Sequence, residues 1–309
     1  MDRRAWTLLF ILGAIWGASY LFIKIGVRDL SPGMVAWARI ALAAIVLLPL
    51  AARAGALSAA RGSGIGWLTL VGIIQAAGPF LLIGAAEEEI SSGLAGILVA
   101  SAPLFTALLA VRYDQEERSS GLRLVGVLLG LAGVAVLLGV DLNGSRSELL
   151  GGLAVLLAGL GYAVGGFLVK RRLAAVPPLG LAAWVMLTSS VILLPVAVAT
   201  LPDAAPGAGP VAAVAALGVL GTGIAFAIFY ELMGRVGPAR TFIVTYLAPG
   251  FAIAYGAIFL DEVITVSTLV GLALILAGSY LAAGRGAGAP GPVAAGDAAE
   301  PAKAVIQVR

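Results

Sequence analysis

Residues 101–111 read SAPLFTALLAV, and residues 247–257 read LAPGFAIAYGA. Each segment places a proline, Pro103 or Pro249, in the middle of an apolar run. A proline inside a helix removes one backbone donor and disturbs the carbonyl group one turn earlier, so each proline predicts an interrupted helix. Because the same pattern returns 146 residues later, the two segments indicate two copies of one structural unit.

The composition is that of a membrane protein. Of the 309 residues, 61% are hydrophobic and 11% are charged, and the mean hydropathy is +1.07. Apolar stretches recur at about the 20-residue length that a helix needs to cross the hydrocarbon core of a bilayer. Since backbone groups in lipid must be satisfied within the segment, we expect an all-α integral membrane protein. Hydropathy and Gly/Pro punctuation predict ten transmembrane helices, at residues 6–25, 33–52, 66–86, 92–111, 122–140, 149–169, 179–200, 211–232, 240–260 and 265–284.

The residue types that are absent exclude several classes of function. The chain has no cysteine and no histidine, so disulfides, the usual zinc sites and imidazole proton relays are excluded. An intramembrane zinc protease needs two histidines, and a membrane serine protease usually pairs serine with histidine. No nucleotide-binding G-x4-G-K-[ST] run occurs either. The sequence therefore predicts no enzyme, no cofactor and no metal site.

The distribution of Lys and Arg predicts the orientation. If the N-terminus is cytoplasmic, 15 of the 19 Lys and Arg residues fall on that side, whereas Lys24, Arg28 and Arg146 fall on the other. This positive-inside bias predicts that both termini are cytoplasmic, and it explains the net charge of +3 without nucleic acid. The carboxylates at 87–89 then lie at a short outer loop, where a solvated rim is the simplest interpretation. Residues 285–309 predict a flexible cytoplasmic tail.

The repeat extends over both halves of the chain. At an offset of 146, Trp16 meets Tyr162, Lys24 meets Lys170 and the prolines coincide; after a one-residue slip Glu117 meets Glu262. We therefore expect a first unit over 1–141 and a second over 142–284, each with five spans. Because five is odd, the second copy enters the membrane from the opposite side. Inverted repeats of this kind are typical of transporters that expose a central site to either side in turn.

The order of these segments resembles the EamA-type family of the drug/metabolite transporter superfamily. In the first half the resemblance rests on AIWGASYLFIKIG, SAPLFTALLA and GLRLVGVLLGLAGVAVL, and in the second on VGPARTFIVTYLAPGFAIAYGAIFLDEVIT and LVGLALILAG. It covers about residues 6–284. The resemblance implies a ten-helix protein of the inner membrane that moves small organic solutes, in many members outward, with the substrate between the halves. It does not imply one substrate or an oligomeric state.

Candidate substrate-binding residues are the polar and aromatic side chains near the expected midplane, together with the two prolines. They are Trp16, Ser19, Gln75, Ser101, Pro103, Tyr162, Thr222 and Pro249, with Tyr230 and Tyr246 somewhat closer to the cytoplasm. Paired Pro-interrupted helices point to a central cavity, although a packing kink is the alternative. For Gln75 the alternative is an interhelical hydrogen bond, and for the aromatic pair it is ordinary packing.

Two charged residues complete the set of candidates. Arg39 lies about six residues into the second span. It is expected to snorkel outward as an interface anchor, to form a structural ion pair, or to act as a counter-ion for an anionic substrate group near the outer vestibule. Glu231 precedes Arg235 by four residues, which suggests a local ion pair first and a proton carrier second. The leading hypothesis is a secondary transporter for a small metabolite, an amino acid or related compound being one candidate, by export or exchange. The alternative is a channel-like or scaffolding membrane protein.

Overall fold

The computed structural model describes residues 1–113, 121–141 and 145–283, so the predicted tail and Glu117 lie outside the described residues. Within these ranges eight helical stretches are long and apolar enough to cross a membrane, and two shorter apolar helices follow them. The eight are Arg3–Gly26, Pro32–Arg53, Ile65–Glu89, Ser92–Ala110, Gly121–Gly139, Arg146–Arg172, Pro178–Ala199 and Ala208–Val236, and the two are Val244–Leu260 and Val266–Ala282. They correspond one to one with the ten predicted spans, so the all-α membrane class is confirmed.

The first five spans contain several interruptions. Their elements are α1 (Arg3–Gly26), α2 (Pro32–Arg53), a short connecting α3 (Ala56–Gly62), α4 (Ile65–Gly72) with η1 (Ile73–Ala77) and α5 (Gly78–Glu89), α6 (Ser92–Val99) with α7 (Ala102–Tyr113), and α8 (Gly121–Val136) with η2 (Leu137–Asp141). Side-chain oxygens of Asp2, Ser31 and Ser91 accept hydrogen bonds from backbone N–H groups in the first turns of α1, α2 and α6. These caps fix where the helices begin.

The last five spans repeat this plan. They are α9 (Arg146–Arg172), α10 (Pro178–Ala199), α11 (Ala208–Gly218) with η3 (Val219–Ile224) and α12 (Ala225–Val236), α13 (Pro238–Thr241) with α14 (Val244–Leu260), and α15 (Val266–Ala283). Pro49 in α2 and Pro195 in α10 are equivalent residues, and each lies inside its helix.

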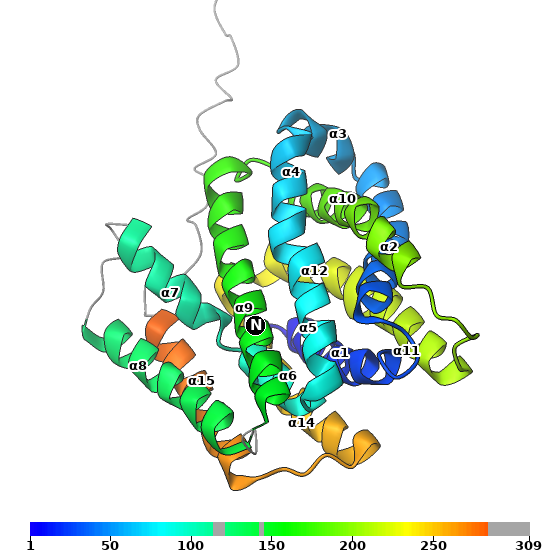
Figure 1. Cartoon of the computed structure of the whole chain (residues 1–309). Helices are drawn as coiled ribbons and strands as arrows, with labels where there is room; N and C mark the ends of the chain where they lie inside the picture. The colour runs from blue at the N-terminus through cyan, green and yellow to red at the C-terminus, as the bar shows by residue number, and fades with distance from the viewer. Residues whose placement is uncertain (114–120, 142–144, 284–309) are drawn as a thin grey trace, which may run out of the picture.

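The two halves pack against each other as a two-fold relation requires (Figure 1). Two contacts join equivalent helices, α2 with α10 and α8 with α15, and a third, α6 with α14, joins the equivalent fourth and ninth spans. Other contacts are reciprocal between spans. The first span, α1, packs on the eighth and ninth spans through α11, α12 and α14, and its equivalent α9 packs on the third and fourth spans through α5, α6 and α7. Such reciprocity is the mark of an isologous interface between two similar units.

The paired interruption falls in spans three and eight. The π-helical segments η1 and η3 begin at Ile73 and Val219, which are 146 residues apart and therefore equivalent in the repeat. A π-helical turn widens the helix by one residue and often marks a functional site. Apart from Gly78-Pro79, which directly follows η1, no residue pattern in these two spans predicts the π-helical turns.

The expectation that both candidate prolines interrupt their helices is half right. The fourth span breaks at residues 100–101, and Pro103 lies in the first turn of α7, where its missing donor costs nothing. Pro249, by contrast, lies inside the continuous helix α14, and the ninth span breaks earlier, between Thr241 and Val244. The prediction of matched breaks at the two prolines is therefore wrong.

Glycines allow one close seam between the halves. A Cβ atom on Gly126 of α8 would lie 2.7 Å from the carbonyl oxygen of Gly278 in α15, and one on Gly133 would lie 2.9 Å from that of Gly271. Only glycine permits backbones to approach this closely. This close approach lies at the contact between spans five and ten.

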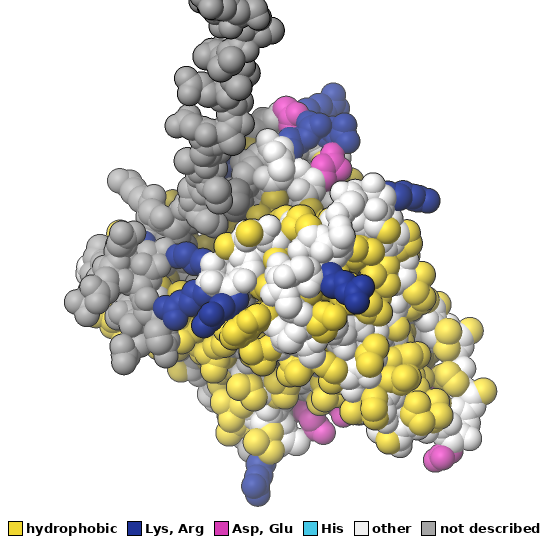
Figure 2. All heavy atoms as spheres, turned by 90° about the horizontal axis from the view of Figure 1, so that it is seen from above, with side chains coloured by type: hydrophobic (Ala, Val, Ile, Leu, Met, Phe, Trp, Pro, Cys, Tyr) yellow, Lys and Arg dark blue, Asp and Glu magenta, His cyan; other side chains and the backbone are white. Residues whose placement is uncertain are grey.

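The surface agrees with a membrane location. Helices α8, α9 and α10 expose many large apolar side chains, among them Leu128, Leu157 and Val191. Figure 2 shows that hydrophobic side chains cover most of one face, and that most of the Lys and Arg side chains visible there lie in its upper half. A belt of apolar side chains around a helical bundle is what contact with lipid requires.

Candidate functional site

Of the three π-helical segments in the described part of the chain, η1 and η3 make equivalent contacts with opposite halves. Gln75 of η1 lies against Gly165 of α9, so closely that a Cβ atom at Gly165 would collide with it. In the other half Gly221 of η3 faces Ser19 of α1, and a Cβ at Gly221 would come within 2.8 Å of the Ser19 hydroxyl. Gln75 and Gly221 are equivalent in the repeat, as are Ser19 and Gly165. The same contact therefore occurs twice, with the larger and smaller side chains exchanged.

The hydrogen bonds at these contacts remain within protein. The amide of Gln75 donates to the carbonyl oxygen of Tyr162 at 3.4 Å, and the hydroxyl of buried Ser19 donates to the carbonyl oxygen of Ile15 at 3.2 Å. Gln75 thus faces the bundle as its sequence position predicted, and it forms the interhelical hydrogen bond that was the alternative to a substrate contact.

Aromatic side chains surround the same contacts. Trp16 packs against Phe226 and Phe229, with ring centres 6.4 and 5.4 Å apart, and Tyr230 stacks on Phe226 at 6.0 Å. Tyr162, the equivalent of Trp16, is half-buried against the core that contains Phe80, the equivalent of Phe226. The predicted aromatic pair therefore lies beside η1 and η3. Each of these rings is buried or half-buried.

Arg39 reaches into the bundle and does not snorkel outward. It is 8% exposed, its Nε donates to Oγ1 of Thr222 at 2.8 Å, and its guanidinium carbon lies 3.7 Å from the centre of the Phe80 ring. Thr222 belongs to η3, is fully buried, and in turn donates to the carbonyl oxygen of Leu217 at 3.1 Å. The prediction of an interface anchor is wrong, because the hydroxyl and the ring together attract the cation inward.

Four further candidates lie away from this cluster or have their polar groups occupied. Ser101 is buried and donates to the carbonyl oxygen of Leu98 at 2.6 Å, while Ser279 of α15 donates to the carbonyl oxygen of Ala100 at 3.1 Å. The groups freed at the break before Pro103 are thus satisfied by protein. Buried Pro249 lies in the part of α14 that packs on α1 near Gly17, and Tyr246, one turn earlier, is half-buried.

Glu231 pairs across the bundle and not along its own helix. Its carboxylate accepts from Arg4 at 2.8 Å, whereas Arg235 donates to Asp2 at 2.7 Å. The prediction of a local Glu231–Arg235 pair is therefore wrong. Both ion pairs are solvent-exposed and tie the start of α1 to the end of α12. An exposed carboxylate with a cationic partner is a poor candidate for a proton carrier within the membrane.

Sequence reasoning missed Glu87. Glu88 and Glu89 are exposed as a solvated rim predicts, but Glu87 is 0% exposed, and neither of its carboxylate oxygens has a hydrogen-bond partner among the described residues. Its backbone oxygen accepts from Lys24, which also donates to the carbonyl oxygen of Ile90 at 2.9 Å. Helical geometry could have found it, because successive residues are about 100° apart and three in a row cannot all face water.

The turn after Glu87 is held from the second half as well. Glu262, in the loop after α14, accepts from the backbone N–H of Ser92 at 2.7 Å, from its hydroxyl at 3.0 Å, and from the N–H of Gly93 at 3.0 Å. A carboxylate at the start of α6 satisfies free donors and is stabilised by the helix dipole. Lys24 of the first half and Glu262 of the second therefore fix the α5–α6 turn.

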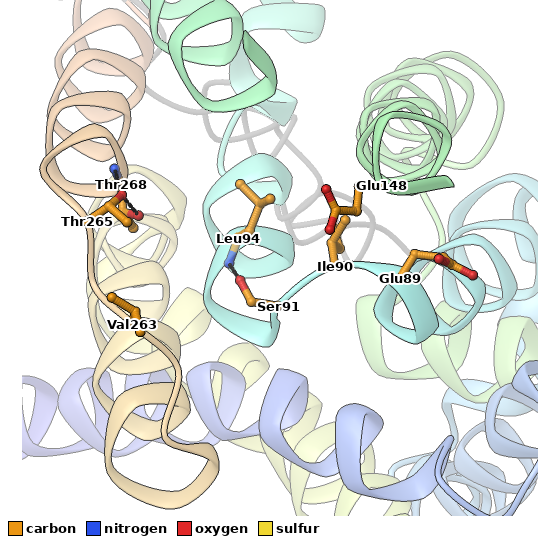
Figure 3. Close-up of a pocket in the computed structure, with 8 residues that line it drawn as sticks. All are labelled: Glu89, Ile90, Ser91, Leu94, Glu148, Val263, Thr265 and Thr268. Carbon is orange, nitrogen blue, oxygen red and sulfur yellow. Dashed lines mark hydrogen bonds between the residues drawn. The ribbon is translucent and has the colours of Figure 1, made fainter. Parts of the chain in front are cut away.

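A surface pocket of about 260 Å³ lies beside this turn. It is bounded by the α5–α6 turn, the start of α9 and the α14–α15 loop, and its lining residues are Glu89, Ile90, Ser91, Leu94, Glu148, Val263, Thr265 and Thr268. Figure 3 shows the carboxylate of Glu148 directed toward the space near Leu94, and that of Glu89 directed away from it. The pocket is open to solvent and does not include the buried cluster around Arg39, so it is a vestibule at most.

Known proteins share both the sequence pattern and the fold. The EamA-like transporter family matches residues 4–139 and 149–284. The uncharacterized inner membrane transporter YedA of Escherichia coli (strain K12) is 30% identical over 80% of this chain and 80% of its own, and a probable amino-acid metabolite efflux pump of the same strain is 26% identical over 91% and 95%. A crystal structure at 22% identity has a TM-score of 0.65 and covers 91% of this chain and 98% of its own, which shows the fold.

Proposed function

Because the chain belongs to the EamA-like transporter family, whose two matches span both halves, we propose that it is a secondary transporter of a small organic metabolite. The solute is an amino acid or a related compound, and it is exported or exchanged across the inner membrane by alternating access. The chain is a multi-pass membrane protein of a family of transporters, and not an enzyme. The repeat boundaries at 141/142 and the cytoplasmic location of both termini are part of this proposal.

The observation that carries the proposal is the reciprocal contact of the two π-helical turns. Gln75 on Gly165 and Gly221 on Ser19 are one contact formed twice, between equivalent elements of opposite halves. Two halves that are similar but not identical can exchange their local conformations, so that a site between them opens first to one side and then to the other. A widened helical turn at each contact supplies a place where the helix can bend.

The chemistry of the buried cluster around Arg39 fits an organic solute with at least one charged group. Trp16, Phe226 and Tyr162 provide aromatic surface, and Arg39 provides a buried cation beside it. The efflux pump of Escherichia coli that resembles this chain is named for amino-acid metabolites, which supports the same class of solute. Export is proposed because that relative is named an efflux pump.

Exchange in proteoliposomes tests the proposal. The purified chain is reconstituted into vesicles loaded with a mixture of unlabelled amino acids, and uptake of each labelled amino acid is followed. A carrier gives saturable uptake that is stimulated by the internal solute, because the loaded protein reorients faster than the empty one. Flux that rises linearly with concentration and ignores the internal solute indicates a channel-like protein. Absence of any flux for metabolite mixtures favours the scaffolding alternative.

A further inference from the structure

Arg39 is a buried cation without an ionic partner among the residues that the structure describes. The described ion pairs, Arg4–Glu231 and Asp2–Arg235, do not include it, and in the described part of the chain the hydrogen bond recorded for its guanidinium is that from Nε to Thr222. Its terminal nitrogens, which form the fork that matches a carboxylate, are left for another partner.

Glu87 is a buried carboxyl group without a hydrogen bond. It lies in the last turn of α5, 0% exposed, with both oxygens unpartnered among the described residues. Burying an ionised carboxylate in this way is costly, so the group needs either a proton or a partner. Lys24 and Glu262 are charged groups nearby, but the Lys24 ammonium donates to two carbonyl oxygens and the Glu262 carboxylate accepts from the start of α6, so neither is bonded to the Glu87 carboxyl group in the described structure.

These two opposite charges lie in one region. Arg39 lies over the ring of Phe80 in α5, and Glu87 lies seven residues, or about two turns, further along the same helix. The two groups form none of the ion pairs of the described residues. Tyr20 of α1 and Tyr162 of α9 pack on one apolar cluster that also contains residues of α2 and α5. No hydrogen bond is recorded for either phenol in the described part of the chain. The region therefore contains an anion, a cation and two hydroxyl groups that are not used to satisfy one another.

We infer that Arg39 and Glu87 form a divided receptor for a zwitterion, in which the guanidinium binds the carboxylate of an α-amino acid and the carboxyl group binds its ammonium. A zwitterion satisfies both buried groups and adds no net charge to the membrane interior, whereas a simple amine or acid leaves one of them bare. The inference rests on the proposed function, because Glu87 is closed off here and a solute reaches it only when the halves open.

Binding to the purified chain in detergent tests the inference. Neutral L-amino acids are ranked by the rise that each produces in the melting temperature. The best ligand is then compared with its matched amine, which lacks the carboxylate, and with its matched acid, which lacks the ammonium. Losing one charge-assisted contact is expected to weaken binding by about 10-fold or more. If no amino acid binds, or if the amine or acid binds as well as the zwitterion, the inference is wrong.

Two isosteric changes give opposite expectations. Glu87→Gln is expected to remove the preference over the acid and keep that over the amine, while Arg39→Gln does the reverse. The exposed neighbours Glu88→Gln and Arg28→Gln are controls that keep both preferences. Uniform weakening toward all three ligands contradicts the inference, and Glu87→Gln decides alone if Arg39→Gln does not fold. If vesicles exchange a singly charged solute and no amino acid, the proposed transport function holds and the zwitterion receptor is refuted. If the zwitterion binds but is not transported, the receptor holds and the transport function is refuted.

Discussion

Nε of Arg39 donates a 2.8 Å hydrogen bond to Oγ1 of Thr222, and this bond joins the second span of the first half to the π-helical turn of the second half. The equivalent positions in the repeat are Val185 and Ala76, whose side chains cannot form it. The two halves thus share their packing but not this polar link. A transporter with one such link has two conformations that differ in energy, since the bond has no counterpart when the halves exchange roles.

Replacing Thr222 by valine tests the importance of that bond. The change keeps the shape of the side chain and leaves the Arg39 Nε–H without its acceptor, so we expect a loss of about 1–3 kcal/mol in the free energy of unfolding. Thermal unfolding in detergent measures it. Thr222→Ser, which keeps the hydroxyl, is expected to retain most of the stability, and so is Thr188→Val, because Thr188 bonds within its own helix. Equal effects at 222 and 188 contradict the special role of the link.

The aromatic pair is expected to matter for transport and not for folding. Trp16→Ala and Tyr162→Ala each remove half-buried surface beside a π-helical turn. Loss of an aromatic wall is expected to raise the KM for the solute by about 10-fold, with normal abundance in the membrane. Trp6→Ala removes a ring that is 45% exposed and is the matched control. Normal transport by both variants excludes the aromatic wall.

Glu262 should stabilise the fold through the start of α6. Glu262→Ala leaves the N–H groups of Ser92 and Gly93 without acceptors, so the free energy of unfolding is expected to fall by about 2 kcal/mol. Thermal unfolding measures the loss. Glu88→Ala removes an exposed carboxylate near the end of α5 and should be neutral. If Glu262→Ala and Glu88→Ala have the same melting temperature, the Glu262 cap does not stabilise the fold.

The exposed ion pairs between α1 and α12 should contribute little. Arg4 and Glu231 have side chains that are 64% and 41% exposed, and such pairs are worth at most about 1 kcal/mol. We expect Glu231→Gln to leave the melting temperature almost unchanged and the transport rate within about two-fold of the wild type. Substrate-driven acidification that disappears in Glu231→Gln would reinstate this residue as a proton carrier.

The same end of the bundle has a defined pH dependence. The Ala5 N–H and Arg235 hold the pKa of Asp2 below its usual value of 3.8. A depressed carboxyl pKa means that the stabilisation is present above the usual value and is lost as the pH falls through the lowered pKa. Asp2→Asn should therefore lower the melting temperature slightly at neutral pH and leave it unchanged in strong acid.

Most of the architecture could be predicted from the sequence because it depends on local signals. The length of the apolar stretches predicts the ten spans. The repeat is predicted by the matched prolines and by the equivalent positions of Trp16 and Tyr162. The burial of Arg39 could not be predicted, because hydropathy records only that a charge lies near a helix end. It does not include the ring of Phe80 or the hydroxyl of Thr222, which the guanidinium contacts inside the bundle. The burial of Glu87 likewise depends on which helix face the neighbours cover.

The π-helical turns show a different limit of sequence reasoning. Residues 73–77 read IIQAA and 219–224 read VLGTGI, and neither segment carries a local signal for an extra residue in the turn. The widened turns become visible only when the partner helix is in place. Proline predicts an irregularity in spans four and nine because its ring disturbs the helix locally. The paired irregularity of spans three and eight arises from packing between helices and has no such local cause.

Gly165 provides a sharp test of the contact that the two halves share. Any Cβ at this position would collide with Gln75, so Gly165→Val must push η1 away from α9. Gly166→Val places the same group where nothing lies within 4 Å and is the matched control in the next residue. We expect Gly165→Val to abolish exchange and Gly166→Val to keep it, and Gln75→Ala, which makes room for the new side chain, to restore part of the activity to Gly165→Val. Exchange and melting temperature are measured together. If Gly165→Val transports normally, the reciprocal contact is not used in the cycle, and the argument from the paired π-helical turns fails with it.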